Sequence, residues 1–447
     1  MLKKQSFSLS GLANKTTVTN IFLVANAFVW YYTILILLQT TVTNLPSSDP
    51  TSLVLIWGLH FSGLIISALV GASLAKKIER SQLLILWMTL GVISSLLLFA
   101  LTSLDVLTIS LLALFLGISL GIGMPTCMSY FTDCIPIESR GRISGITMFV
   151  SGIGIFAFTV AQTSNTLILG VVLAVWRLSS LIVFNSVKSL KKTENKRSFP
   201  SYRLIFSQRS FILYFVPWVM FSLVNYLTTP LQPTPEKGTA DILMLVQIGF
   251  LGLFALLGGF FLDSVGRKRI AMAGFIMLGL GAAVVGVFAE NPLSLYFNSV
   301  INGVAWGLLL VLFVLTIWGD LSYSSASEKY YALGVMPFFV SNFLDFAIGK
   351  TIAANISSSA LFSFTAFFLF LAVLPLFYAP ETLPEKTIKD RELKNYLDKA
   401  QKVAQKEAEK NQKQDTHQPE KENEKAIKET KESPEDEEAH KLAEKYY

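Results

Sequence analysis

The loop that runs from Asp263 to Arg269 carries the densest pattern of charged and turn-forming residues in this chain. It reads Asp-Ser-Val-Gly-Arg-Lys-Arg and follows a long apolar stretch that contains Gly259. Gly266 can adopt the positive φ that a short reversal needs, and the Asp263 carboxylate can cap the N-terminus of the helix that follows. The Arg267 guanidinium can bridge to a neighbouring helix end. The spacing therefore predicts a tight turn with a fixed charge pattern.

A weaker copy of this loop lies near the start of the chain, at residues 71–80. Gly71 precedes Gly259 by 188 residues (259 − 71), and Trp30 precedes Trp218 by the same number (218 − 30). A second basic segment, around Arg140, repeats near residue 329 at almost the same offset. A repeat of this length predicts two similar halves related by pseudo-symmetry.

The early copy of the loop lacks its carboxylate. Ala75 stands where the later loop has Asp263. A latch in the first half is therefore either lost or works through Lys76 and Glu79 instead, and the second half is expected to carry more of any gating.

Long apolar stretches surround these loops. The chain is 52% hydrophobic and 15% charged, whereas soluble domains are about one quarter charged. Each stretch can cross about 30 Å of hydrocarbon, and in lipid it must be helical because its backbone groups need internal partners. We expect twelve transmembrane helices, at residues 19–44, 52–75, 82–103, 105–131, 141–165, 167–187, 210–232, 241–262, 268–289, 292–319, 330–352 and 357–379.

The expected fold is an all-α integral membrane protein with the twelve helices in two pseudo-symmetric six-helix bundles. The predicted boundaries are residues 1–187 for the N-terminal bundle, 188–209 for a cytoplasmic linker and 210–384 for the C-terminal bundle. The remaining segment, 385–447, is rich in both acidic and basic residues and poor in large apolar ones. We expect it to be a charged cytoplasmic tail, disordered or partly helical.

Basic residues predict the orientation of the helices. With residue 1 inside, the inside loops hold most of the Lys and Arg side chains, and the outside loops hold only Lys237 and Lys350. This bias places both termini in the cytoplasm of a multi-pass plasma-membrane protein. The basic character then reflects topology and contact with anionic lipid. We expect the lipid bilayer and a small-molecule substrate as partners, no nucleic acid, and a monomer.

Two further segments complete a recognisable pattern. Glu138-Ser139-Arg140-Gly141-Arg142-Ile143-Ser144-Gly145 follows the fourth span, and Pro380-Glu381-Thr382-Leu383-Pro384 follows the last. Together with the Asp263–Arg269 loop, they resemble the motifs of the major facilitator superfamily of secondary transporters, over residues 19 to about 385. The resemblance implies two bundles that rock about a midplane site and a latch between them at the cytoplasmic mouth. The implied gate residues are Gly259, Asp263, Gly266, Arg267, Lys268, Arg140, Arg142 and Glu381.

Polar and aromatic residues within the spans are candidates for a substrate cavity. Asn26 lies four residues before Trp30, and Asn225 lies seven after Trp218, so each pair shares a helical face. If the first and seventh spans line a central cavity, as in the family, the two indoles flank a bound solute. The alternative is that they are interfacial or packing side chains.

His60, Arg177 and Asp345 are the ionisable side chains deepest in the spans, where a charge is costly unless it is paired or hydrated. His60 can exchange a proton near neutral pH, and Asp345 can act as a proton site or cation ligand. The alternative for His60 is a neutral, hydrogen-bonded ring. Arg177 lies about 15 Å from the inner end of its span, too far to reach the interface. We expect it to pair with a neighbouring helix, with a substrate anion as the alternative.

Several chemistries have no support in the sequence. There is no Gly-x4-Gly-Lys-Ser/Thr loop, no His-Glu-x2-His and no paired-cysteine metal pattern. Cys127 and Cys134 are interpreted as unpaired thiols. We expect no enzyme activity, no cofactor and no metal site.

The function that these features favour is secondary transport of a small organic solute, with a proton as the candidate coupling ion through Asp345 or His60. The cavity candidates are mostly aromatic and amide, which favours a neutral or amphipathic solute. Efflux of amphipathic compounds is slightly favoured, although the fifth span lacks the proline of the antiporter motif. Uptake of a neutral metabolite such as a sugar is the alternative, although no dense cluster of Asn, Gln, Asp and Glu supports it. A transporter-like sensor or scaffold that signals through the tail is an alternative of another class.

Overall fold

The structure is a computed structural model in which the chain divides into two compact units, residues 1–382 and 383–447. The first unit contains the helices that position the site. The expected tail falls in the second unit and lies almost entirely outside the described residues. The described residues are 15–45, 49–103, 105–161, 165–187, 198–228, 237–288, 291–323, 325–353 and 357–384, with a few positions between 397 and 404.

The first half of the helical unit is built from apolar helices with polar caps. Asp105 accepts a hydrogen bond from the Thr108 backbone N–H at 2.9 Å, and Asn165 accepts one from the Leu167 backbone N–H at 3.0 Å. Such caps satisfy backbone groups that the first turn leaves free. The elements are α1 (Lys15–Thr43), α2 (Pro50–Leu74), α3 (Arg80–Leu96), the 3₁₀ segment η2 (Leu97–Ser103), α4 (Val106–Gly121), α5 (Met124–Cys134), α6 (Arg140–Val160) and α7 (Thr166–Ser186).

The expected fourth span is interrupted between α4 and α5. Pro125 near the start of α5 has no N–H to donate back into the preceding turn. The Trp87 indole packs against Gly123, where any Cβ would collide with the ring, and its Nε1–H donates to the Leu120 carbonyl at 2.9 Å. The tryptophan thus satisfies a carbonyl that the break exposes.

The second half repeats this architecture, again with a distortion in its fourth long span. There the helix passes through a π-helical turn, in which the Thr316 hydroxyl donates to the Val311 carbonyl at 2.8 Å. The elements are α8 (Tyr202–Ser207), α9 (Arg209–Thr228), α10 (Lys237–Ser264), α11 (Arg267–Val287), α12 (Pro292–Leu310), the π segment η5 (Val311–Thr316), α13 (Ile317–Leu321), α14 (Glu328–Ala353) and α15 (Ser358–Tyr378).

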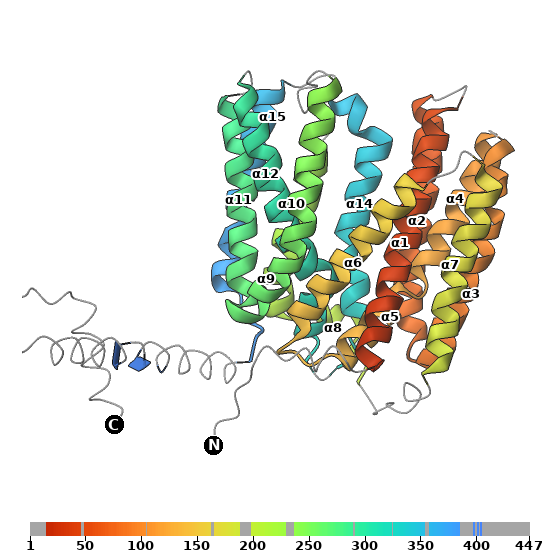
Figure 1. The fold of residues 1–447 in the computed structure, drawn as a ribbon, viewed down its shortest axis with the longest axis horizontal. Helices are drawn as coiled ribbons and strands as arrows, with labels where there is room; N and C mark the ends of the chain where they lie inside the picture. The colour runs from red at the N-terminus through yellow and green to blue at the C-terminus, as the bar shows by residue number, and fades with distance from the viewer. Residues whose placement is uncertain are drawn as a thin grey trace, which may run out of the picture. The chain divides into compact units, whose positions relative to one another are not determined.

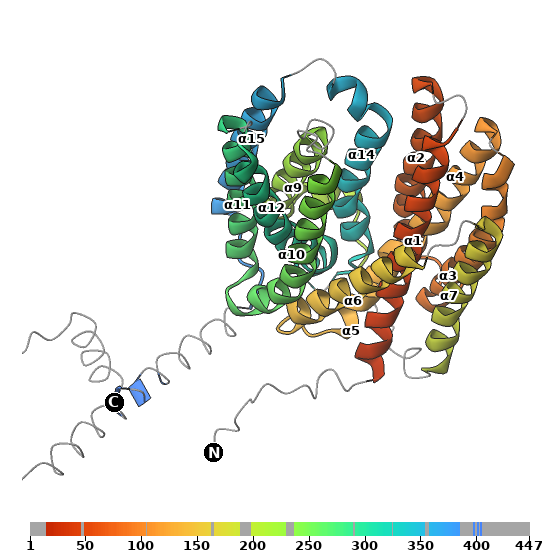
Figure 2. The same cartoon turned by 45° about the horizontal axis from the view of Figure 1, so that its top comes forward.

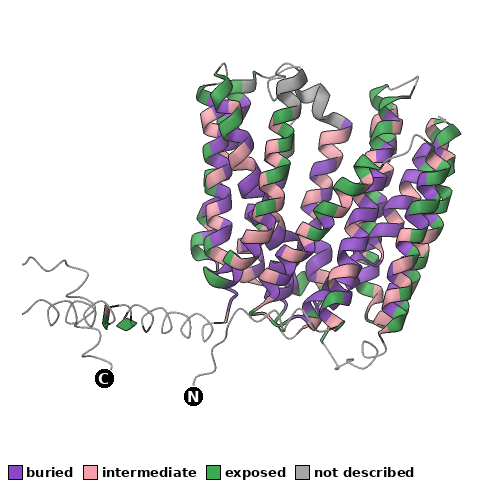
Figure 3. Cartoon of the chain, in the orientation of Figure 1, coloured by how far each residue is buried: buried purple, intermediate pink, exposed green. Residues whose placement is uncertain are grey.

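Length and composition identify a multi-pass membrane protein. In the described part of the chain, ten helices are long and apolar enough to cross a bilayer, and α9 and α14 occupy the places of the expected seventh and eleventh spans. Large apolar side chains such as Leu107, Phe156 and Ile182 face outward, as the exposed bands in Figure 3 illustrate. Apolar surface of this extent is rare on soluble monomers and suits contact with lipid.

The helices form two bundles whose internal contacts correspond, with α1 to α7 in one and α9 to α15 in the other (Figures 1 and 2). α2 packs on α4 as α10 packs on α12, and α3 packs on α7 as α11 packs on α15. Between the bundles, α6 packs on α10 and α2 packs on α14. Because α2 corresponds to α10 and α6 corresponds to α14, each of these two contacts is the symmetry counterpart of the other. This is expected for a chain with a repeat near 188 residues.

Candidate functional site

The two bundles come into close backbone contact where α6 crosses α10. A Cβ on Gly145 would lie 2.9 Å from the Gly259 Cα, and a Cβ on Gly259 would lie 2.5 Å from the Gly141 carbonyl oxygen. Only glycine permits this backbone approach. Farther along the same helices, Cβ atoms on Gly152 and Gly252 would meet nothing within 4 Å. The helices thus meet near the start of α6 and separate beyond it.

Asp263 joins the two bundles at this crossing. Its carboxylate accepts hydrogen bonds from the backbone N–H groups of Gly141 at 2.9 Å and Arg142 at 2.8 Å. It also pairs with Arg142 Nε and Arg267 Nη2, each at 3.2 Å. The sequence expectation that Asp263 caps the helix after its own loop is wrong, because the carboxylate caps α6 of the other bundle instead.

Glu381 takes the capping role that was expected of Asp263. Its carboxylate accepts the backbone N–H of Arg267 at 2.9 Å and of Lys268 at 3.1 Å, at the start of α11. Gly266 precedes that helix with φ of 112°, and a Cβ there would lie 2.5 Å from the Glu381 carboxylate. Both the backbone conformation and the close carboxylate therefore require glycine at this turn.

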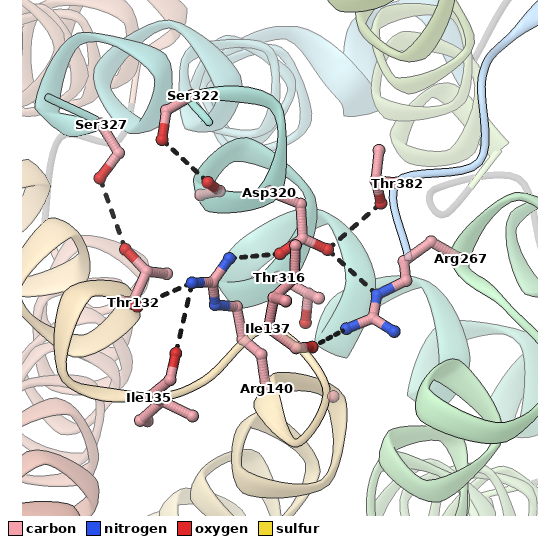
Figure 4. A network of polar contacts seen from close by, with 12 residues as sticks. Thr132, Ile135, Ile137, Arg140, Arg267, Thr316, Asp320, Ser322, Ser327 and Thr382 are labelled. Atoms are coloured by element: carbon pink, nitrogen blue, oxygen red, sulfur yellow. Dashed lines mark hydrogen bonds and ion pairs between the residues drawn. The ribbon is translucent and has the colours of Figure 1, made fainter. Parts of the chain in front are cut away.

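Asp320 is the centre of a buried ion-pair network at the same end of the bundles (Figure 4). One carboxylate oxygen pairs with Arg140 of the first bundle, and the other pairs with Arg267 Nε at 3.0 Å and accepts from the Thr382 hydroxyl at 3.2 Å. Arg267 also donates to the Ile137 carbonyl at 2.6 Å, across the bundle boundary. One carboxylate thus holds arginines from both halves.

Sequence reasoning missed Asp320, although the repeat contained the signal. Arg267 follows Arg80 by 187 residues (267 − 80), and Asp320 follows Asp133 by 187 (320 − 133). The Arg80–Asp133 pair, at 2.6 Å, is therefore the counterpart of Arg267–Asp320. Extending the repeat search to single charged residues would have found both pairs.

Arg80 also crosses between the bundles. It forms an ion pair with Glu328, which is buried, and donates to the Ser129 hydroxyl at 2.9 Å. The expectation that the first-half latch works through Lys76 and Glu79 is wrong, because the side chain that reaches the other bundle is Arg80. We call the end of the bundles that carries Arg80, Arg140 and Arg267 the basic end.

A partly open cavity of about 40 Å³ lies between the bundles. Its walls are almost wholly aromatic, aliphatic and sulfur-containing side chains, and the hydroxyls of two tyrosines are among the few polar groups. The lining residues are Val24, Ala27, Phe28, Tyr31, Tyr32, Trp87, Leu120, Met124, Cys127, Met128 and Met148 from the first bundle, and Trp218, Leu310, Val314, Val335, Phe338 and Phe339 from the second.

The structure separates the two tryptophans that were expected to flank a solute. Trp218 lines the cavity, stacks on Phe313 at 4.7 Å and donates to the Gly334 carbonyl at 2.8 Å. Trp30 does not line it, because that face of α1 packs inside its own bundle, where the indole donates to the Ser95 hydroxyl at 2.7 Å. The cavity-facing residues of α1 are instead neighbours of Trp30, such as Tyr31.

The other predicted cavity residues lie at various distances from the cavity wall. Asn26 packs inside the first bundle and donates to the Trp176 carbonyl at 2.7 Å. His60 is buried behind Tyr31, with Nδ1 2.9 Å from the Ala113 carbonyl oxygen and Nε2 3.4 Å from the Tyr31 hydroxyl. Asp345 is half-buried in α14 and makes no ion pair with any described residue. The Asn225 side chain lies outside the described residues.

Arg177 lies fully buried in the first bundle. Its guanidinium is between the rings of Trp30 and Trp87, and Nη1 donates to the Asn26 side-chain oxygen at 3.1 Å.

In the described residues, no group of three or more His, Cys, Asp and Glu side chains could hold a metal ion. Cys127 and Cys134 are both free thiols.

The fold and site define a helical membrane protein with two related bundles, an ion-paired basic end and an apolar central cavity. Residues 2–159 match the sequence family described as the Major Facilitator Superfamily. Two solved structures share the fold. The proton:xylose symporter XylE bound to 6-bromo-6-deoxy-D-glucose gives a TM-score of 0.65 at 14% identity, over 83% of this chain and 97% of that one. FucP in the outward conformation gives 0.62 at 12% identity, over 82% and 99%.

A curated relative, the glucose transporter GlcP of Staphylococcus epidermidis, is 34% identical over 104 residues. That match covers 22% of this chain and about a quarter of the relative, 23% of its length. The family match is confined to residues 2–159, and the two solved structures show that the fold extends over most of the chain.

Proposed function

We propose that this protein is a secondary transporter that carries a small amphipathic organic solute by alternating access. The bundles are joined at the basic end by glycine-mediated helix contact and by ion pairs, including those of Asp263 and Asp320. Such a latch holds one mouth closed while the cavity is reached from the other side. Rocking of the bundles then requires these contacts to break and re-form.

The apolar cavity is the observation that carries the choice of solute. Its indole N–H groups are already satisfied, that of Trp87 by the Leu120 carbonyl and that of Trp218 by the Gly334 carbonyl. Burial of a polyhydroxylated solute against such walls would leave its hydroxyls without partners, at about 1–3 kcal/mol each. Aromatic and thioether walls instead favour a solute with a large apolar surface.

Uptake of a sugar is the second candidate, and the relatives favour it. GlcP is a glucose transporter, and XylE is a proton:xylose symporter bound to a glucose derivative. The lining of the cavity argues the other way, so the two candidates make opposite predictions for binding.

The coupling ion and the orientation follow from charge placement. We propose a proton as the coupling ion, with His60 and Asp345 as candidate carriers. The His60 ring lies behind the cavity wall, and the Asp345 carboxylate has no described ion-pair partner. We propose that the basic end faces the cytoplasm of a plasma membrane, as the positive-inside rule requires. A monomer with both termini inside, a role in efflux and the four predicted segments of the chain are also retained as proposals.

Ligand binding to the purified full-length protein tests the choice of solute. Naphthalene-2-carboxamide and D-glucose are compared by the increase in melting temperature that each produces, because a ligand that binds only the folded state stabilises it. We expect the carboxamide to raise the melting temperature and glucose to leave it unchanged. The reverse result would reject the amphipathic solute in favour of the sugar.

The sensor or scaffold alternative is tested by removing the tail after Glu385. A transporter retains solute flux in proteoliposomes after this truncation. A sensor that signals through the tail retains solute binding but loses its output.

A further inference from the structure

Arg177 carries a positive charge inside the first bundle that no carboxylate in the described part of the chain neutralises. The side chain is 0% exposed, with its guanidinium 5.1 Å from the Trp30 ring centre and 4.1 Å from that of Trp87. Stacking of this kind offsets only part of the desolvation cost of a buried charge. Among the described residues, no carboxylate forms an ion pair with it.

The hydrogen-bonding capacity of Arg177 is also largely unused. Nη1 donates to the Asn26 side-chain oxygen at 3.1 Å, whereas Nε and Nη2 have no partner. These two nitrogens present parallel N–H groups along one edge of the guanidinium, the edge that binds a carboxylate in a bidentate manner. A buried donor without a partner costs about 1–3 kcal/mol, so two of them on one edge indicate a missing acceptor.

The surrounding helix leaves space for the arginine. Gly91 of α3 lies against it, and a Cβ at that position would lie 2.5 Å from Nε and 2.8 Å from the Cγ of Arg177. A larger residue would displace the guanidinium from between the two indoles. Glycine at position 91 therefore keeps the guanidinium between the two indoles.

The space around Arg177 adjoins the central cavity. Trp87, whose ring covers the guanidinium, also lines the cavity. One indole therefore borders both the cavity and the guanidinium. Displacement of Trp87, which breaks its hydrogen bond to the Leu120 carbonyl, would open the guanidinium to a ligand in the cavity.

We propose that Arg177 is the recognition site for the acidic group of the transported solute, which makes that solute an amphipathic carboxylate. The carboxylate binds the Nε and Nη2 edge, and the apolar part of the solute occupies the cavity. This proposal rests on the proposed function, because it takes the apolar cavity as the solute site.

A matched pair of probes tests this proposal. Naphthalene-2-carboxylate and naphthalene-2-carboxamide have the same apolar part and differ in charge at pH 7. Binding of each to the full-length protein is measured by tryptophan fluorescence. Charged hydrogen bonds of about 1.5–3 kcal/mol predict that the wild-type protein binds the carboxylate roughly 10- to 100-fold more tightly. In Arg177→Met we expect the two affinities to agree within about twofold, and in Arg177→Lys a partial preference to remain.

Trp218→Phe on the opposite wall is the control, and it should weaken both probes by a similar factor. If the wild-type protein binds the two probes equally well, the proposal fails, whatever the stability of the Arg177 variants. It also fails if Arg177→Met keeps the full preference. If neither probe binds the wild-type protein, the amphipathic cavity itself is rejected, which is the failure of the proposed function.

Discussion

The Asp263 carboxylate at the end of α10 accepts the backbone N–H of Gly141 at the start of α6, at 2.9 Å. The two residues belong to different bundles and are 122 positions apart in the chain. A helix N-terminus is partly positive, so the contact is a charge–dipole interaction as well as a hydrogen bond. Closure of the basic end therefore depends on the Asp263 carboxylate, whose charge can be removed with little change in the shape of the side chain.

Replacement of Asp263 by Asn should open the basic end. The amide loses the charge and can accept at only one of the two oxygens that the Gly141 and Arg142 N–H groups use. Loss of about 1.5 kcal/mol predicts a roughly tenfold rise in the ratio of open to closed basic ends. Spin labels at the exposed positions Glu138 and Ser264, after Cys134→Ser, measure the separation.

Arg269→Gln is the matched control for this prediction. Arg269 is exposed on the same loop and pairs with no described carboxylate. It should leave the distance distribution unchanged. An unchanged distribution in Asp263→Asn would contradict the role of Asp263 in closure.

A larger side chain at the crossing of α6 and α10 should also open the basic end, because it forces the two helices apart. In Gly259→Val, the new side chain must displace the backbone of α6, because even a Cβ there would lie 2.5 Å from the Gly141 carbonyl oxygen. We expect a wider basic end and a lower melting temperature. Gly252→Ala on the same helix, where a Cβ meets nothing within 4 Å, should be neutral or up to about 1 kcal/mol stabilising. Equal effects of the two substitutions would refute the close crossing.

The Arg80–Glu328 pair should be energetically coupled across the bundles. Glu328 is buried, so loss of either partner leaves a costly group behind, and the two single losses should not add. In a double-mutant cycle with Arg80→Gln and Glu328→Gln, SDS-induced unfolding should give a coupling of about 1–3 kcal/mol. The cycle with exposed Lys77→Gln should be additive. A coupling near zero for Arg80 would show that the first-half latch lies elsewhere.

Filling the cavity should abolish binding without unfolding the protein. Ala27 lines the cavity on α1, and Ala27→Phe introduces a ring into the space that a solute would occupy. The stabilisation by naphthalene-2-carboxamide should disappear. Gly152→Phe, on an exposed part of α6 with nothing within 4 Å, should keep it. Retained binding in Ala27→Phe would place the solute site outside this cavity.

Local sequence patterns were sufficient for the membrane class, for the repeat and for the positive φ at Gly266. Each depends on residue type at short range or on a fixed offset. The partners of Asp263 and Glu381 could not be predicted in this way, because both carboxylates sit near the start of α11. Which of them caps it is decided by how the second bundle packs against the first.

The residues that line the cavity could not be predicted from local sequence patterns either. Trp30 and Trp218 are equivalent by the repeat, yet only Trp218 faces the cavity. Trp30 is held inside the first bundle, where its indole donates to the Ser95 hydroxyl and lies beside the buried Arg177. A helical pattern that is apolar on all sides does not indicate which face meets the cavity, so this distinction required the structure.

Solute flux in proteoliposomes tests the central claim most directly. Ethidium and naphthalene-2-sulfonate, two membrane-impermeant amphipaths of opposite charge, are compared with D-glucose, with and without a pH gradient. We predict saturable uptake of at least one amphipath, its loss in Ala27→Phe and no uptake of glucose. Saturable uptake of glucose without that of either amphipath, or no flux of any of the three, would contradict the account.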